Sequence, residues 1–145
     1  MDKYTKTDVE FVSKENLDGW SVLKVRIFEQ AMADYFHAWR VLNEFKSYPH
    51  DISEWTDKMC NRAYYYITRE TAEMKQIENF FCSPWFGILY PKMDGDIVEA
   101  AIKRKCTSKY GKIISQKRTN EIIELLKVWR KQLIEERKAH ENHIV

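Results

Sequence analysis

The chain has 145 residues, of which 44% are hydrophobic and 32% are charged, and its net charge is +2. This length suits one domain, and the composition is typical of a globular protein rather than a disordered one. Four glycines and three prolines are too few for an all-β sandwich or barrel, which needs a turn about every 8–12 residues. We therefore expect one all-α domain over residues 1–145.

Glycine and proline leave three long segments of the chain without helix breakers. They occur at Gly19, Pro49, Pro84, Gly87, Pro91, Gly95 and Gly111. Because helix interiors exclude these residues, segments 20–48, 50–83 and 112–145 are predicted to be helices, with short connector helices in segment 84–111. The five-residue connection at residues 47–51 predicts that the first two helices pair as an antiparallel hairpin over residues 20–83.

Apolar side chains recur at helical spacing in each long segment, which supports this prediction. The three stripes are Phe28, Met32, Tyr35, Trp39 and Leu42; Cys60, Ala63, Ile67, Met74, Ile77 and Phe81; and Ile122, Leu126, Trp129 and Leu133. Glu70 interrupts the second stripe. A helix of about 30 residues would be about 45 Å long, so we expect either a break near residues 68–71 or an elongated molecule.

Capping residues predict where two of the helices begin. Asp51 and Glu54 have the spacing of a capping box for the second helix. Ser83 before Pro84 is typical of the start of a short helix. Residues 1–17 fit two structures, since Thr7 and Glu10 have helix-cap spacing, whereas Val9 and Phe11 alternate as in an edge strand; we favour the helix.

Charge is divided unevenly along the chain. Residues 1–102 hold 12 Lys and Arg against 17 Asp and Glu, a net −5, whereas residues 103–145 hold 12 against 5, a net +7. The acid-free run 103–118 contains seven cations among small hydroxyl residues, a mixture that can bind phosphates. The candidate nucleic-acid-binding residues are Lys103, Arg104, Lys105, Lys109, Lys112, Lys117 and Arg118. The alternative is that the basic and acidic parts attract each other within the fold or within a dimer.

Aromatic side chains are concentrated in two places. Residues 80–90 hold five around a Ser-Pro helix start, and we expect most of them to fill the core where the chain reverses. Tyr64, Tyr65 and Tyr66 point about 100° apart on a helix, so at least one faces away from the core. The candidate partner-binding residues are Trp55, Tyr64, Tyr65 and Trp85.

The aromatic segment carries a resemblance to a known group of proteins. The pattern Glu78-x-Phe80-Phe81-x-Ser83-x-Trp85-Phe86, followed by Asp94-Gly95-Asp96-Ile97, resembles a segment of small uncharacterised proteins of phages and mobile elements of Gram-positive bacteria. Pro84 departs from that pattern. The resemblance covers about 20 residues; it implies a phage or mobile-element setting, and no reaction or functional residue.

Catalytic and metal-binding signals are scarce. We expect Cys60 and Cys82 to be small core residues. Cys106 beside Lys105 is a candidate reactive thiol, although the sequence suggests no histidine to partner it. No glycine-rich phosphate loop, nucleophile elbow or zinc-protease motif is present, so we expect no catalytic residue, no bound metal and no cofactor.

One acidic cluster allows a metal-dependent nuclease as a third hypothesis. Asp94, Asp96 and Glu99 precede Lys103 and Lys105, and such carboxylates can hold Mg²⁺ beside phosphate. The same residues are explained as a helix with acids at its start and bases at its end, because the helix dipole favours that order. We expect Asp96 and Glu99 to cap a short helix that ends near Lys105.

These observations predict a non-enzymatic protein that acts by binding. The sequence contains no apolar run of about 20 residues, so we expect no membrane contact and a cytoplasmic location in a host cell. The first hypothesis is contact with a protein partner, such as inhibition of a host defence factor, with a homodimer as a further option. The alternative is a DNA- or RNA-associated accessory protein that uses residues 103–131.

Overall fold

The computed structural model describes residues 19–144, so the prediction for residues 1–18 lies outside the described part of the chain. Within the described part every regular element is a helix, and the all-α prediction is confirmed. The elements are the α-helices α2 (Gly19–Glu44), α3 (Asp57–Phe81), α4 (Pro84–Leu89), α5 (Gly95–Tyr110) and α6 (Gln116–Ile144), with short 3₁₀ turns η1 (Phe45–Ser47) and η2 (Ile52–Glu54).

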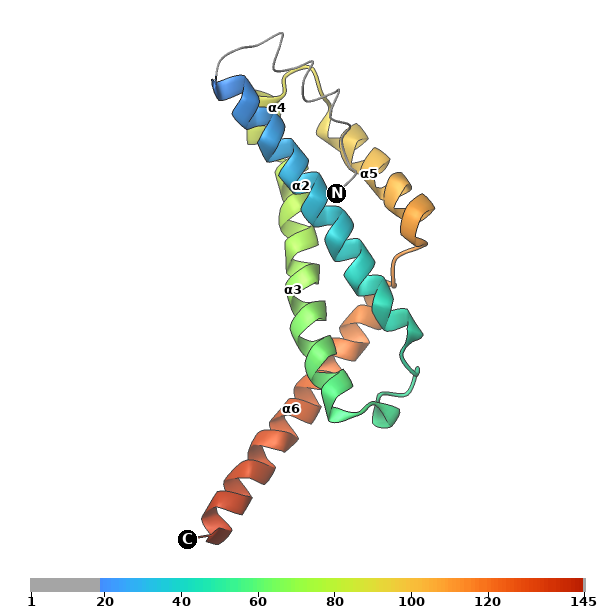
Figure 1. The fold of residues 1–145 in the computed structure, drawn as a ribbon, viewed down its shortest axis with the longest axis vertical. Coiled ribbons are helices and arrows are strands. Elements are labelled where there is room, and N and C mark those ends of the chain that lie inside the picture. The colour runs from blue at the N-terminus through green and yellow to red at the C-terminus, as the bar shows by residue number, and fades with distance from the viewer. Residues whose placement is uncertain (1–18, 145) are drawn as a thin grey trace.

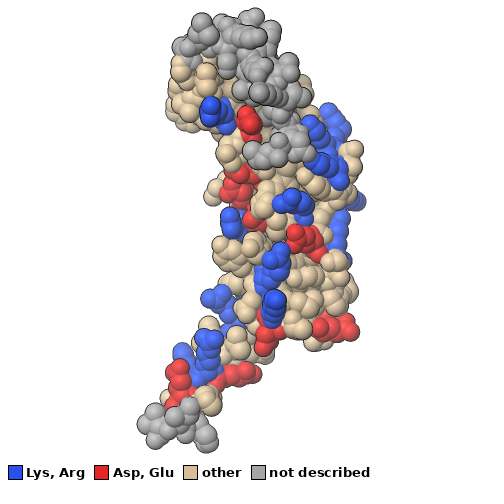
Figure 2. All heavy atoms as spheres, viewed as in Figure 1, with Lys and Arg blue, Asp and Glu red and all other residues tan. Residues whose placement is uncertain are grey.

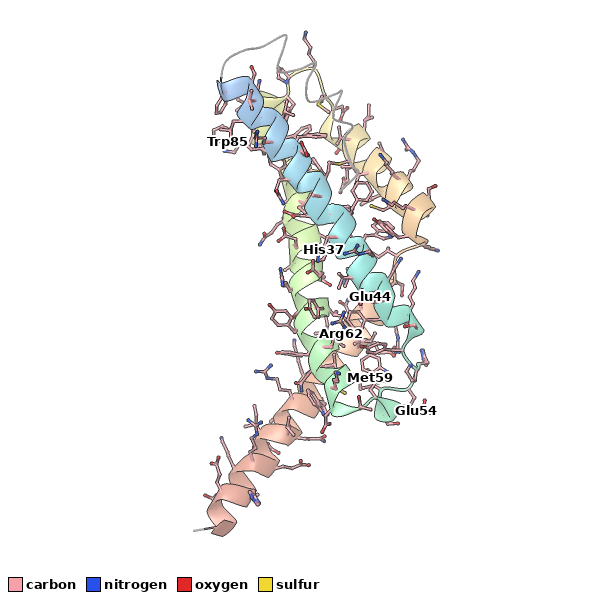
Figure 3. All side chains as sticks on the ribbon, viewed as in Figure 1. His37, Glu44, Glu54, Met59, Arg62 and Trp85 are labelled. Atoms are coloured by element: carbon pink, nitrogen blue, oxygen red, sulfur yellow. The ribbon has the colours of Figure 1, made fainter. Side chains whose placement is uncertain are left out.

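The helices α2 and α3 form the predicted antiparallel hairpin (Figure 1). An ion pair joins them near the turn, where Arg62 Nη2 lies 2.9 Å from Glu44 Oε2; both side chains are labelled in Figure 3. The helix α5 packs against both members of the hairpin, and α6 crosses α3 and then extends beyond the rest of the molecule. The molecule is therefore elongated.

The predicted apolar stripes form the core. Every apolar member of the α3 stripe is buried, as are Met32, Tyr35, Trp39 and Leu42 of the α2 stripe. In α6 the stripe is buried only in its first half, at Ile122 and Leu126, and becomes half-buried where the helix leaves the body. The hydrophobic contact that holds α6 therefore lies in its N-terminal half.

The structure corrects the predicted start of α3 and decides between a break in this helix and an elongated molecule. Asp51 caps the 3₁₀ turn η2, where its side chain accepts a hydrogen bond from Ser53 N, and the N-cap of α3 is Thr56, which accepts from Met59 N. The helix runs unbroken from Asp57 to Phe81, so the elongated alternative is correct. Thr68 does not interrupt it, because its hydroxyl donates to Tyr64 O at 2.6 Å within the helix.

The chain reverses at the end of α3 over an aromatic cluster. Ser83 caps α4 as predicted, with Pro84 in its first turn. Phe81 and Phe86 are buried with ring centroids 5.5 Å apart. Phe28 of α2 packs on the same rings, and the Tyr90 hydroxyl donates to Lys24 O at 2.5 Å. The cluster therefore joins α4 to the first half of α2, and the core role expected for this segment is confirmed for these rings.

The helix α5 begins earlier and ends later than predicted. Asp94, rather than Asp96, is its N-cap and accepts a hydrogen bond from Asp96 N. The helix ends at Tyr110, and Gly111 follows with φ of 86°, in the left-handed region that favours glycine. Glycine at this position turns the chain from α5 into the segment that leads to α6.

Candidate functional site

The four candidate partner residues do not form one surface. Trp55 is buried in the loop that connects α2 to α3, and its indole Nε1 donates to Pro49 O at 2.7 Å. Tyr48 stacks edge-on against it at 4.9 Å between ring centroids. The assignment of Trp55 to a partner surface was therefore wrong: the residue lies in the loop before α3 and fixes the path of that loop.

The tyrosine run on α3 is split between the two faces of the helix, as predicted. Tyr65 is 55% exposed, while Tyr64 and Tyr66 are half-buried. The Arg130 guanidinium of α6 lies 4.7 Å from the Tyr64 ring centroid, so Tyr64 serves contact within the chain. Of the tyrosines predicted to bind a partner, Tyr65 alone is left as an exposed candidate.

Trp85 lies at the end of the hairpin opposite its turn, where Glu54 and Met59 are found (Figure 3). It is 64% exposed on α4, and Ile88 on the same helix is 67% exposed. The first turns of α2, which lie at the same end, expose Trp20 and Leu23. We call these four side chains the apolar end surface: Trp20, Leu23, Trp85 and Ile88.

An apolar groove lies between α2 and α3 near the same end. It has a volume of about 320 Å³, and Ile27 and Ala31 of α2 and Ile77 and Phe80 of α3 contribute its apolar wall. Ile27 is seven residues after Trp20, which places it on the same side of α2. Apolar side chains therefore continue from the end surface along the hairpin.

The seven cations predicted to bind nucleic acid are divided among different roles. Arg104, Lys105 and Lys109 are exposed on α5, and Figure 2 shows Lys and Arg side chains gathered along the α5 side of the molecule. Arg118 is tied into the fold, because its guanidinium donates to His50 O at 2.6 Å and pairs with Glu121. Lys117 is exposed in the first turn of α6.

The remaining two predicted cations, Lys103 and Lys112, line a cavity that the sequence did not reveal. Its volume is about 690 Å³, and its walls come from α2, α3, α5, the start of α6 and the segment 112–115. Lys103 Nζ lies 3.6 Å from Glu78 Oε2 and 3.4 Å from Glu99 Oε1. The Tyr35 hydroxyl donates to Glu78 Oε2 at 2.7 Å, and burial together with this carboxylate raises the pKa of Tyr35, which stays protonated.

The acidic cluster at the start of α5 is explained by hydrogen bonds and ion pairs. Asp94 caps the helix, and Glu99 pairs with Lys103. Cys82 is exposed, contrary to our expectation, and its thiol donates to Asp96 Oδ1 and Glu99 Oε2. Partial burial and these two acids raise the pKa of the Cys82 thiol, which favours the protonated donor over the thiolate that binds metals.

The other two cysteines are buried. Cys60 fills the core as expected, and burial raises its pKa. Cys106, the candidate reactive thiol, is also fully buried, and desolvation raises its pKa to about 12 despite the neighbouring Lys105. A buried thiol with this pKa is unreactive at neutral pH, so the candidate assignment was wrong.

Two further findings bear on identity. No helix among residues 19–144 combines the length and the apolar character that a membrane crossing requires. Comparison with protein-family models, with curated proteins and with solved structures found no match to this chain.

Proposed function

We propose that this protein acts by non-catalytic contact with a protein partner, and that the contact is centred on the apolar end surface. The observation that carries this proposal is the exposure of two tryptophans, at 56% and 64%, together with Ile88 and Leu23 at one end of a highly charged molecule. Single exposed apolar residues are ordinary, whereas a group of large ones marks an interaction site.

The composition of the end surface fits the centre of a protein interface. Tryptophan is among the residues that contribute most to binding energy when a partner buries them. A standard interface covers about 800 Å² on each partner, so the four side chains would form its centre. The groove beside Ile27 and Phe80 extends the same contact along the hairpin.

The setting we propose is a phage or mobile element acting in the cytosol of a host cell, with inhibition of a host defence factor as the effect. The resemblance of the aromatic segment, residues 78–97, supports this setting. The same segment carries Trp85, so the feature that resembles the phage proteins also contributes the exposed tryptophan of the proposed surface.

Site-specific photo-crosslinking tests the proposal. p-Benzoylphenylalanine in place of Ile88 should cross-link one defined protein in the native host. p-Benzoylphenylalanine in place of Glu54, at the opposite end of the hairpin (Figure 3), should give no such cross-link. The double variant Trp85→Ser, Ile88→Ser should lose the complex and keep its helical spectrum, because both side chains are exposed. Equal cross-linking from both positions contradicts the proposal, and a cross-link between two copies of the chain assigns the surface to a homodimer.

The alternative function, contact with DNA or RNA, is favoured by one specific observation. Arg104, Lys105 and Lys109 are exposed together on α5, where they could contact phosphates. Lys105 also lies 6.0 Å from the Phe36 ring centroid, which gives it a role in the fold. The predicted set of seven is reduced, because Lys103 and Arg118 are engaged in ion pairs.

A further inference from the structure

One wall of the cavity beside Lys103 and Lys112 is formed by the segment between α5 and α6, which hydrogen bonds hold against α2. Trp39 Nε1 donates to Gly111 O at 2.9 Å, and Asn43 Nδ2 donates to Tyr110 O at 3.1 Å. Ile114 N in turn donates to Asn43 Oδ1 at 3.1 Å. These three bonds fix the segment to α2, so the wall is formed before any ligand binds.

One part of the cavity is apolar. Trp39 and Leu42 of α2, Met74 of α3 and Ile113 and Ile114 of the connecting segment line it. The volume of about 690 Å³ lies within the range of small-molecule sites, and an apolar lining with a few polar groups is typical of such sites. The cavity can therefore enclose the body of a small organic molecule.

The rest of the cavity has an excess of positive charge. Lys75, Lys103 and Lys112 line it together with one carboxylate, Glu78. Lys103 and the Tyr35 hydroxyl already pair with Glu78. Lys75 and Lys112 have no carboxylate within 4 Å among residues 19–142, where side chains are described. Two cations are therefore left to attract an anion at this site.

Hydrogen-bond donors also line this cavity. The helix α6 begins at Gln116, which lines the cavity, and Ser115 caps it by accepting a hydrogen bond from Arg118 N. The first amides of a helix and its dipole favour an anion. Thr71 also lines the cavity, and its buried Oγ1 has no hydrogen-bond partner among the described residues. Threonine populates two rotamers in a helix, so this hydroxyl can turn towards a ligand without backbone movement.

The geometry points to a binding site for a phosphate monoester with an apolar or aromatic body. The phosphate would accept hydrogen bonds from Lys75, Lys112 and the start of α6, because its three oxygens and double charge match several converging donors. The body would pack against Trp39 and the two isoleucines of the connecting segment. This inference does not depend on the proposed partner surface, because none of Trp20, Leu23, Trp85 and Ile88 lines the cavity.

Calorimetric titration of the full chain with phenyl phosphate and with AMP tests the site. We expect at least one of them to bind at one site per chain, at least about tenfold more tightly than inorganic phosphate or phenol. Only the esters supply both the phosphate group and the apolar body that the cavity would hold. Inorganic phosphate binding as tightly as both esters would show an adventitious ion only. Absence of binding by both esters at about 5 mM would overturn the proposal.

Three variants locate the site. Lys112→Gln should weaken binding at least about fivefold, whereas Lys58→Gln, about 20 Å away along α3 from Thr71, should leave it unchanged. Thr71→Val should weaken binding while leaving the unliganded protein as stable or more stable, because it removes a buried hydroxyl that has no partner. The assignment would be overturned if Lys112→Gln and Lys58→Gln lost equal binding affinity. It would also be overturned if Thr71→Val destabilised the free protein and bound the ester with unchanged affinity.

Discussion

Glu70 occupies a position of α3 where the apolar stripe calls for a hydrophobic side chain. It is 1% exposed, and its Oε1 has no hydrogen-bond partner among the described residues. Arg69 Nε lies 3.6 Å and His37 Nε2 4.0 Å from that oxygen, and the Arg69 and His37 side chains are about half exposed. The carboxylate is therefore desolvated, with ionic contacts that are longer than hydrogen bonds.

Replacing Glu70 should stabilise the protein. We expect Glu70→Leu to raise the free energy of unfolding by about 1–3 kcal/mol, because it continues the apolar stripe and removes a buried charge. Urea unfolding followed by circular dichroism measures the change. Glu70→Ala is the control, since it removes the charge and leaves a cavity. A loss of stability in Glu70→Leu would show that the contacts with Arg69 and His37 outweigh the cost of burial.

Cysteine reactivity gives a second test at the residue scale. Cys82 is the exposed cysteine of the three, so iodoacetamide at about pH 8 should modify Cys82 and spare Cys60 and Cys106 in the folded protein. The pKa of Cys82 is raised, so its thiolate fraction is low at pH 8 and the rate should increase as the pH rises further. Peptide mass spectrometry identifies the modified residue, and denaturant should expose all three. Rapid modification of Cys106 in the folded state would contradict its burial.

At the scale of elements, Gly95 shows how closely two helices approach. A Cβ atom at this position would lie 1.8 Å from Phe81 O, the carbonyl oxygen of the last residue of α3. A backbone atom cannot move aside as the end of a side chain can, so the start of α5 must carry glycine. By contrast, a Cβ at Gly87 in α4 would have no atom within 4 Å.

These two glycines make a matched pair for mutagenesis. Gly95→Ala should destabilise the protein by about 3 kcal/mol or more, because the helices must separate to admit the methyl group. Gly87→Ala should be neutral or stabilise the protein by about 0.5–1 kcal/mol, since alanine loses less entropy than glycine in a helix. Thermal unfolding compares both with the parent. Equal effects would show that α3 and α5 do not meet at Gly95.

The helices could be predicted because helix breakers and the helical spacing of apolar residues are visible within each segment of the sequence. The exact start of each helix could not be predicted, because several residues in each connection can act as caps. Thr56 prevails over Asp51, and Asp94 over Asp96. This shift has a functional consequence, since moving the start of α3 past Trp55 takes that residue off the helix and buries its indole in the loop. Predicting such a choice requires the tertiary contacts of the loop.

The cavity could not be predicted for the same reason. Its fixed wall depends on Trp39 and Asn43 bonding to residues about 70 positions later in the chain, and no local pattern signals such a contact. The sequence did identify Lys103 and Lys112 as cations of an unusual run. Their place beside a common cavity follows from how α5 and α6 pack against the hairpin.

For the molecule as a whole, the uneven charge of the chain is partly balanced within the fold. Lys103 from the basic part pairs with Glu78 and Glu99 from the acidic part. The prediction that the two parts attract each other within the fold is confirmed for Lys103. The cations of α5 that face solvent remain the basis of the nucleic-acid alternative.

Salt dependence separates the two functions. If the protein acts through the apolar end surface, we expect no measurable binding to a duplex or single strand of about 20 nucleotides at about 150 mM salt. If the α5 cations contact phosphates instead, binding will appear. The logarithm of affinity will then fall with the logarithm of salt concentration with a slope of about −2 to −4, since two to four exposed cations can reach duplex phosphates.

In that case, the triple variant Arg104→Gln, Lys105→Gln, Lys109→Gln should flatten the slope. The matched control Lys127→Gln, Lys131→Gln, Lys138→Gln, which removes the same charge from α6, should leave it unchanged. Fluorescence anisotropy across a salt series measures both, and binding with this pattern would replace the protein-contact proposal.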